Sequence, residues 1–255
     1  MKKFLLSTTF VATFALLAAC SDDSGVSGNS GACSDDSCVS SSSSAEGDDM
    51  IDPRDGQTYK TVTIGTQTWM AQNLNYAPDE NHVHSLGDYA WSGCYDNEIS
   101  NCAKYGHLYT WEVAMDKAGC DFFNDCMNSN EGSQGICPVG WHLPSKEEWE
   151  TLFAVSGGFV ACKNLKSASG WREGGNGTDA YGFSALPAGK GYGFSALTAG
   201  DGYFNSVDYI THFWSSSEFN STLAYIIALV YNSESALLVY EDKNLARSVR
   251  CLKDN

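Results

Sequence analysis

The chain has 255 residues and a formal net charge of −16 at pH 7. An acidic surface of this size repels phosphate backbones, and no basic patch interleaved with aromatic residues occurs in the sequence, so we expect no nucleic-acid partner. The length allows one domain with a substantial core.

The start of the chain has the layout of a bacterial secretion signal. Lys2 and Lys3 precede an apolar stretch over residues 4–16, and small residues precede Cys20. The stretch is shorter than the roughly 20 residues of a transmembrane helix, and its flanks are typical of a cleaved signal peptide. We therefore predict a signal peptide at residues 1–19 and lipidation of Cys20, as in bacterial lipoproteins, with acyl chains such as palmitate.

Two or more acyl chains hold a protein stably at a membrane surface. We therefore expect a lipid-anchored protein of the cell envelope that does not span the membrane. Ser21 stands where an aspartate often signals retention in the inner membrane. Serine at this position favours the outer membrane and surface exposure, with the inner membrane as the alternative.

The segment that begins at Cys20 is predicted to be a flexible tether. Residues 20–50 are dominated by Ser, Gly and Asp and contain no aromatic residue, so they cannot bury enough apolar surface to offset the entropy of ordering. Cys33 and Cys38 could close a small loop within this tether. All Trp and Tyr residues follow it, and we predict that residues 51–255 form one loop-rich α+β domain.

Strand patterns lie near both ends of this domain. Residues 58–70 alternate apolar and polar side chains around Gly65, which predicts a hairpin. Residues 223–231, 236–240 and 246–252 are also predicted strands, the first of them buried on both faces.

Two helices are predicted in the middle of the domain. Ser145 and Glu148 form a capping-box pattern, and Trp149 and Leu152 follow at helical spacing. The second helix is predicted over residues 108–117, where apolar side chains recur on one helical face.

The chain has ten cysteines, and lipidation of Cys20 leaves nine. Disulfide pairing is the default outside the cytoplasm, so at least one cysteine should stay unpaired. Local spacing suggests two short bridges, and the remaining pair would join the middle of the domain to its last strand. The predicted pairs are Cys94 with Cys102, Cys120 with Cys126, and Cys137 with Cys251. Cys162 is left as a free, buried thiol. No Cys/His spacing typical of zinc occurs, so no metal site is predicted.

Three weaker patterns could indicate a metal site or a catalytic site. His82 and His84 could bind a metal from one face of a strand, although a loop is the preferred interpretation. Residues 174–179 are rich in oxygen and could hold a structural calcium ion, although a turn is preferred. His212 and the serines of residues 215–217 show no pattern that places a base beside a nucleophile, so no catalytic residue is predicted.

An eleven-residue segment occurs twice, because residues 181–191 and 192–202 are identical at nine of eleven positions. The preferred interpretation is a duplicated surface loop, and the alternative is an altered binding loop. Trp214, Tyr203 and Tyr209 flank it and form the candidate ligand site, because sugars bind on exposed aromatic faces. Three further tryptophans are predicted to be structural: Trp141, Trp149 and Trp171.

Several segments together resemble one family. They are residues 52–59, 64–76, 109–111, 114–116, 137–145, 148–149, 165–167, 170–171, 176–179, 181–189, 213–218 and 248–251. In this order they resemble the Fibrobacter succinogenes major paralogous domain, over about residues 51–253. Members are commonly surface lipoproteins of fibre-associated and gut bacteria, which agrees with the interpretation of Cys20.

This family is similar, more distantly, to the C-type-lectin-like fold of formylglycine-generating enzymes. The resemblance implies paired N- and C-terminal strands with long structured loops between them, and a bridge between Cys137 and Cys251 fits that arrangement. It brings no catalytic residues, because the family has no established activity. The formylglycine-generating enzymes use a cysteine pair near the C-terminal end, whereas only Cys251 lies late here, which disfavours copper-dependent oxidation.

The sequence therefore predicts a non-enzymatic, lipid-anchored binding or adhesion module at the cell surface, without a cofactor and with plant cell-wall polysaccharide as the candidate ligand. One alternative is a structural envelope protein that packs with other surface components. The other, disfavoured, is an enzyme of the formylglycine-generating type.

Overall fold

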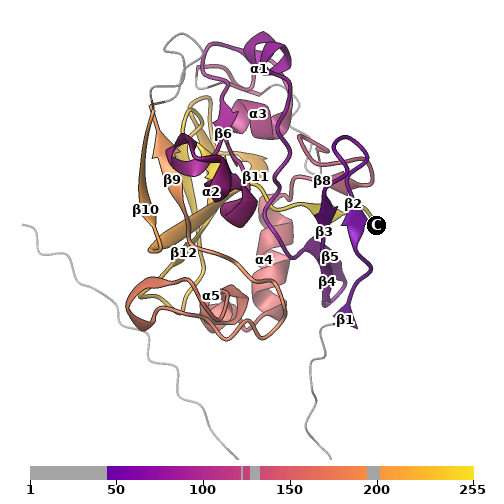
Figure 1. Cartoon of the computed structure of the whole chain (residues 1–255), viewed down its shortest axis with the longest axis vertical. Helices are drawn as coiled ribbons and strands as arrows, with labels where there is room; N and C mark the ends of the chain where they lie inside the picture. Colours follow the sequence, from indigo (N-terminus) through magenta and orange to yellow (C-terminus); the bar gives the residue numbers. More distant parts are fainter. Residues whose placement is uncertain (1–44, 122, 127–132, 194–201) are drawn as a thin grey trace, which may run out of the picture. The chain divides into compact units, whose positions relative to one another are not determined.

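The computed structural model describes residues 45–121, 123–126, 133–193 and 202–255 (Figure 1). The predicted signal peptide, the lipidation of Cys20 and a loop closed by Cys33 and Cys38 lie outside the described residues. Within them, no helix combines the length and the apolar character needed to cross a bilayer. The described part is a mixed, sheet-rich domain with short helices.

A small sheet joins the two ends of the domain. Its strands, in spatial order, are β1 (Ala45–Glu46), β4 (Thr61–Ile64), β5 (Gln67–Met70), β15 (Leu252–Lys253) and β8 (Trp141–His142). The predicted hairpin is confirmed as β4 and β5, with Gly65 in the turn at φ +64°, a left-handed conformation that favours glycine. Leu252 pairs with Trp69, so the last strand closes onto this hairpin.

The fold begins earlier than the sequence predicted. β1 pairs with β4, and β2 (Met50–Ile51) pairs with β3 (Thr58–Tyr59). Residues 45–50, whose composition resembles that of the tether, therefore belong to the domain. These residues pair through backbone hydrogen bonds at the edge of a sheet. Such bonds do not require apolar side chains, so amino-acid composition does not predict them.

A large sheet follows the path β10–β9–β11–β14–β7–β6, with β12 and β13 extending it from β11. The strands are β6 (Ser92–Gly93), β7 (Leu108–Tyr109), β9 (Ala188–Tyr192), β10 (Tyr203–Val207), β11 (Ile210–Glu218), β12 (Leu223–Val230), β13 (Leu237–Asp242) and β14 (Arg247–Ser248). The predicted strands over residues 223–231 and 236–240 are confirmed as β12 and β13. Four consecutive residues of β12 are buried, as its apolar run predicted.

The predicted strand over residues 246–252 is instead two short strands. β14 belongs to the large sheet and β15 to the small one, and residues 249–251 cross between them. This crossing places Arg250 and Cys251 between the two sheets, where both are buried.

The helices are short. They are α1 (Glu80–Leu86), α2 (Ile99–Tyr105), α3 (Trp111–Met115), α4 (Lys146–Val155) and α5 (Ala161–Leu165), with 3-10 turns η1 (Tyr95–Asn97), η2 (Gly158–Val160) and η3 (Arg172–Gly174). The capping box of α4 is confirmed, because Ser145 Oγ accepts from Glu148 N and Glu148 Oε2 accepts from Ser145 N at 2.8 Å. In Figure 1, α4 stands between strands β3–β5 and the large sheet.

The helix predicted over residues 108–117 is only half as long as expected. Leu108 and Tyr109 form β7, which pairs with β14 and β6. The helix α3 starts at Trp111 and ends at Met115, and the residue after it, Asp116, has a left-handed φ of 51°. Tertiary strand pairing therefore outweighs the helical periodicity at the N-terminal end of this segment.

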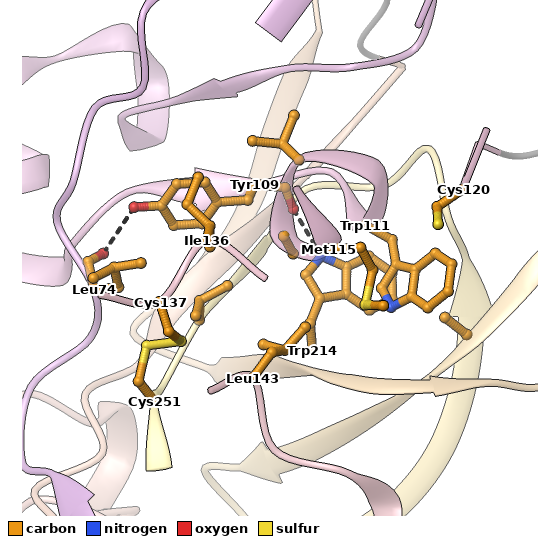
Figure 2. Close-up of a cluster of buried hydrophobic side chains, with 14 of the residues drawn as sticks. Leu74, Tyr109, Trp111, Met115, Cys120, Ile136, Cys137, Leu143, Trp214 and Cys251 are labelled. Carbon is orange, nitrogen blue, oxygen red and sulfur yellow. Dashed lines mark hydrogen bonds between the residues drawn. A yellow bond between two sulfur atoms is a disulfide. The ribbon is translucent and has the colours of Figure 1, made fainter. Parts of the chain in front are cut away.

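Aromatic side chains fill the interior. In one cluster, Trp214 Nε1 donates to Tyr109 O at 2.7 Å (Figure 2). Trp111 Nε1 donates to Ser215 O at 2.8 Å. A second cluster packs α4 against both sheets through Trp69, Trp149, Phe183 and Phe213. The prediction that three tryptophans are structural is confirmed by their burial: Trp141, Trp149 and Trp171.

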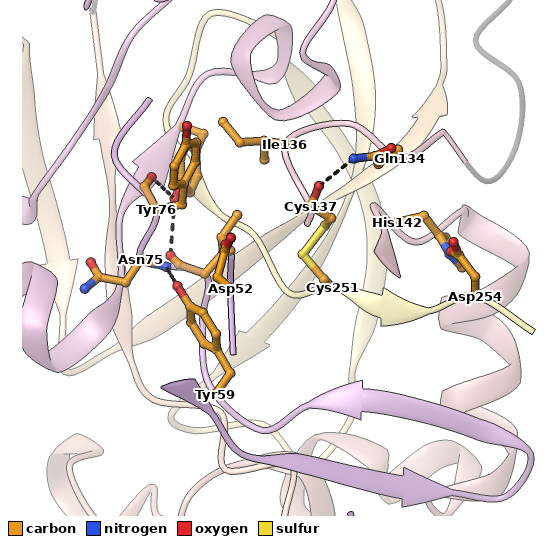
Figure 3. The surroundings of a disulfide bond; sticks show 12 residues. Asp52, Tyr59, Asn75, Tyr76, Gln134, Ile136, Cys137, His142, Cys251 and Asp254 are labelled. Atoms are coloured by element: carbon orange, nitrogen blue, oxygen red, sulfur yellow. Dashed lines mark hydrogen bonds and ion pairs between the residues drawn. A yellow bond between two sulfur atoms is a disulfide. The ribbon is translucent and has the colours of Figure 1, made fainter. Parts of the chain in front are cut away.

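All three disulfides predicted for the domain are present. They are Cys94–Cys102, Cys120–Cys126 and Cys137–Cys251. The third closes a loop of 114 residues and ties the start of β8 to the crossing segment (Figure 3). Cys162 is the free cysteine among the described residues, and it is buried as predicted.

The first copy of the repeated segment holds the core position. Phe183 from this copy is buried against Trp69 and Phe213, with ring centroids 5.8 and 6.1 Å away. Most of the second copy lies in residues 194–201, outside the described part, but Tyr192 belongs to β9. The fold therefore uses the first copy where a single copy would be expected.

Candidate functional site

The predicted aromatic ligand site is not assembled as expected. Trp214 has 0% exposure, so it cannot present a ring face to a ligand, and this part of the prediction is wrong. Tyr203 is 61% exposed and stacks on Tyr192 at 4.9 Å. Tyr209 is half-buried, and Arg172 lies 4.8 Å over its ring. The aromatic ring of Trp214, which suggested a sugar-binding face, belongs to the hydrophobic core.

The two weaker metal patterns have structural partners. His82 and His84 lie on α1, which Asp79 caps, and not on a strand or loop. Residues two apart on a helix do not share a face, so the expected pair of imidazoles is not formed. In residues 174–179, the carboxylate of Asp179 accepts from Ser184 N at 2.7 Å and from Ser184 Oγ at 2.5 Å, which stabilises a turn.

His212 belongs to a buried ion-pair network. Its Nδ1 lies 3.1 Å from Glu241 Oε2, which also accepts from Arg247 Nε at 2.5 Å. Burial lowers the pKa of His212. Burial opposes ionisation of Glu241, but its contacts with His212 and Arg247 lower the carboxyl pKa to about 2. Among the described residues, no hydrogen bond joins His212 to the serines of residues 215–217, so its role here is structural.

The strongest candidate site is a polar groove, which we define as two adjoining cavities of about 350 and 530 Å³ that share Ala71, Gln72 and Ser184. The first cavity is also lined by Gln57, Asn73, Asn75, Lys104, Tyr105 and Arg250. The second is also lined by Asp49, Lys60, Asp179 and Tyr181. Such volumes are typical of small-molecule and sugar sites.

Segments that are far apart in the sequence supply this lining. Gln57 precedes β3, Gln72 follows β5, Lys104 lies in the last turn of α2, and Ser184 precedes β9. The β4–β5 hairpin brings the first two segments together, and Gln72 Oε1 accepts from Lys60 N at 2.7 Å across it. Closure of the small sheet by β15 then sets the crossing segment, with Arg250, beneath the first cavity.

A pair of side-chain amides forms one wall of the first cavity. Asn75 Nδ2 donates to Gln57 Oε1 at 2.8 Å, and Gln57 Nε2 donates to Asn75 O at 2.7 Å. Tyr59 Oη accepts from Asn75 N at 3.0 Å (Figure 3), and burial raises the pKa of this phenol to about 12. Asn75 Oδ1 is buried and has no hydrogen-bond partner within the described residues, so this atom does not contribute to the surface of the cavity.

Exposed polar groups line the opening of the groove. Gln72 is exposed, and its Nε2 donates to no described protein group. Lys104 is also exposed and donates to Tyr105 Oη at 2.6 Å. Free amide donors beside hydroxyl groups can bind a polar chain such as a sugar polymer.

Sequence reasoning did not identify this groove. Its residues are single polar side chains in separate turns and helix ends, without a motif that links them. The available signal was indirect: Gln57, Gln72, Asn75 and Arg250 all lie inside segments that carry the family resemblance.

Comparison with known proteins supports that resemblance directly. The model of the Fibrobacter succinogenes major domain matches residues 62–253. No curated protein and no solved structure matches the chain. Because the match covers most of the chain, this protein belongs to the Fibrobacter succinogenes major domain family.

Proposed function

We propose that this protein is a lipid-anchored, surface-exposed binding module that holds a polysaccharide chain in the polar groove and does not act as an enzyme. The observation that carries the proposal is the convergence of separate family segments on one groove lined by amides and hydroxyls. Lipidation at Cys20 and placement in the outer membrane are part of this proposal, motivated by the signal-like start of the chain.

Three features support sugar binding in particular. The free Nε2 of Gln72, an exposed side chain, offers a donor for hydroxyl groups. The half-buried ring of Tyr181 lines the second cavity and offers an apolar face. The groove extends over two cavities, which suits a polymer better than a single small molecule.

Two features support a binding role over catalysis. Cys251 is held in a disulfide and Cys162 has 0% exposure. Neither of these two cysteines therefore offers an accessible thiol for chemistry of the formylglycine type. We further propose that the domain has a C-type-lectin-like fold, which the pairing of β5 with β15 supports.

Retention of the full chain, purified in detergent, on insoluble and soluble plant polysaccharides tests this proposal. Gln72→Ala should weaken retention, because it removes a groove donor. Gln134→Ala is the matched control, because Gln134 is also exposed and also makes one hydrogen bond to the backbone, but lies outside the groove. Absence of retention on every polysaccharide would reject the proposal.

A second candidate function, packing against other envelope components, is favoured by an apolar surface on β13. Tyr240 and Phe219 are 50% and 44% exposed, and their rings stack at 4.1 Å. Such exposed apolar strands commonly mark interaction surfaces. Cross-linking on intact cells distinguishes the two functions, because protein neighbours without polysaccharide binding would favour packing.

A further inference from the structure

The buried arginine beneath the groove differs from the other arginines of the chain. The chain has four arginines. Three of them pair with a carboxylate: Arg54 with Asp52, Arg172 with Glu173, and Arg247 with Glu241. Arg250 forms no ion pair with any described residue, although it is only 1% exposed. A buried charge is normally paired, so the missing partner requires an explanation.

Neutral groups surround the Arg250 guanidinium. Nε and Nη2 donate to Asn73 Oδ1 at 3.2 and 2.6 Å. Nη1 donates to Met70 O at 3.2 Å and to Phe183 O at 2.5 Å. A guanidinium has five N–H donors, so one N–H of Nη2 is left without an acceptor among the described residues. The positive charge is therefore held in place but not neutralised.

The first cavity has an unusual charge for this protein. Its lining includes Arg250 and Lys104 but no Asp or Glu, whereas the whole chain has 31 acidic and only 15 basic residues. Burial lowers the pKa of Arg250 to about 9, with the charge of Asp179 acting in the opposite direction, so the guanidinium remains charged at neutral pH. Two cations at a partly enclosed site attract an anion more strongly than they would in bulk water.

We propose that the first cavity binds the carboxylate of an acidic sugar residue, with Arg250 and Lys104 supplying the charge and the amides of Gln57 and Gln72 contacting hydroxyl groups. This inference rests on the proposed polysaccharide-binding function and names its substrate class, a uronic-acid polymer. The net charge of −16 opposes any anionic polymer, so the proposal depends on the two cations that line this cavity and on the absence of Asp and Glu from its lining.

The test uses the full chain in detergent and four immobilised probes: polygalacturonate, its methyl ester, cellulose and dextran sulfate. We expect retention on polygalacturonate that weakens as salt rises, and little retention on the other three. Equal retention on polygalacturonate and its methyl ester would overturn the carboxylate inference and leave polysaccharide binding intact. Equal retention on dextran sulfate would also overturn it, because charge alone would then explain binding. No retention on any probe would defeat both proposals.

A charge variant at the exposed cation provides the second measurement. Lys104→Gln should weaken polygalacturonate binding about two- to fivefold, the effect of one solvent-exposed ionic contact. Lys253→Gln is the matched control, because Lys253 is also exposed but lies outside the groove. Unchanged affinity in the Lys104→Gln protein, or an equal loss in the control, would count against the site.

Discussion

Arg250 and Asn73, which are 177 residues apart, are joined by two hydrogen bonds to one amide oxygen, Asn73 Oδ1. Asn73 Nδ2 donates in turn to Tyr105 O at 2.8 Å. This amide therefore links the hairpin, the end of α2 and the crossing segment, and it fixes the cation beneath the groove.

Asn73→Leu should lower the free energy of unfolding by about 3 kcal/mol, because it leaves a buried charge with fewer acceptors. Urea denaturation measures the change. Asn81→Leu, at an exposed position on α1, is the control and should change stability by less than about 0.5 kcal/mol. Equal effects in the two variants would show that the Arg250 network contributes little.

Removal of the long-range disulfide should destabilise the domain more than removal of a short one. In the chain-entropy model, loops of 114 and 8 residues correspond to about 5 and about 2.5 kcal/mol. Cys137→Ser with Cys251→Ser should therefore lower the midpoint of thermal unfolding further than Cys94→Ser with Cys102→Ser. The reverse order would show that native-state contacts, and not loop length, set the contribution.

His142 should make stability depend on pH. Burial acts against its charged form, but hydrogen bonds with Glu148 at 3.0 Å and Asp254 at 2.7 Å outweigh burial and raise its pKa. A raised folded-state pKa gives stabilisation that is complete below the ordinary value of 6.5 and is lost as the pH rises through the folded value.

His142→Gln should therefore cost more stability at pH about 5.5 than at pH about 8.5. Chemical denaturation of the two proteins at both pH values gives the difference. A cost that is the same at both would show that His142 contributes through packing and not through its charge.

Glu112 should destabilise the domain at neutral pH. It is 1% exposed, and burial, with nearby Asp121 as a smaller cause, raises its pKa to about 8. The folded state then binds a proton that the unfolded state has lost, so stability falls as the pH rises from the ordinary carboxyl value of 4.5 to about 8.

Glu112→Gln should therefore raise the free energy of unfolding by about 1–3 kcal/mol at pH 7 and have little effect near pH 4. Glu150→Gln, at an exposed position on α4, is the control. Stabilisation at both pH values would point to a change in packing instead.

The sequence by itself determined the elements whose causes are local. The β4–β5 hairpin follows from alternation around a glycine turn, α4 from its capping box, and the short disulfides from spacing. Family membership was also visible, because the matching segments are short continuous motifs. Each of these features depends on residues that are near one another in the chain.

The tertiary structure alone decided the features that depend on distant pairing. β7 forms where a helix was expected because β14 is available to pair with it, and Trp214 is buried because β11 lies inside the large sheet. The polar groove arises because the β4–β5 hairpin brings the segments of Gln57 and Gln72 together and closure by β15 adds Arg250. No local sequence pattern predicts that these side chains lie close together. Each side chain is positioned by hydrogen bonds to a different segment of the chain.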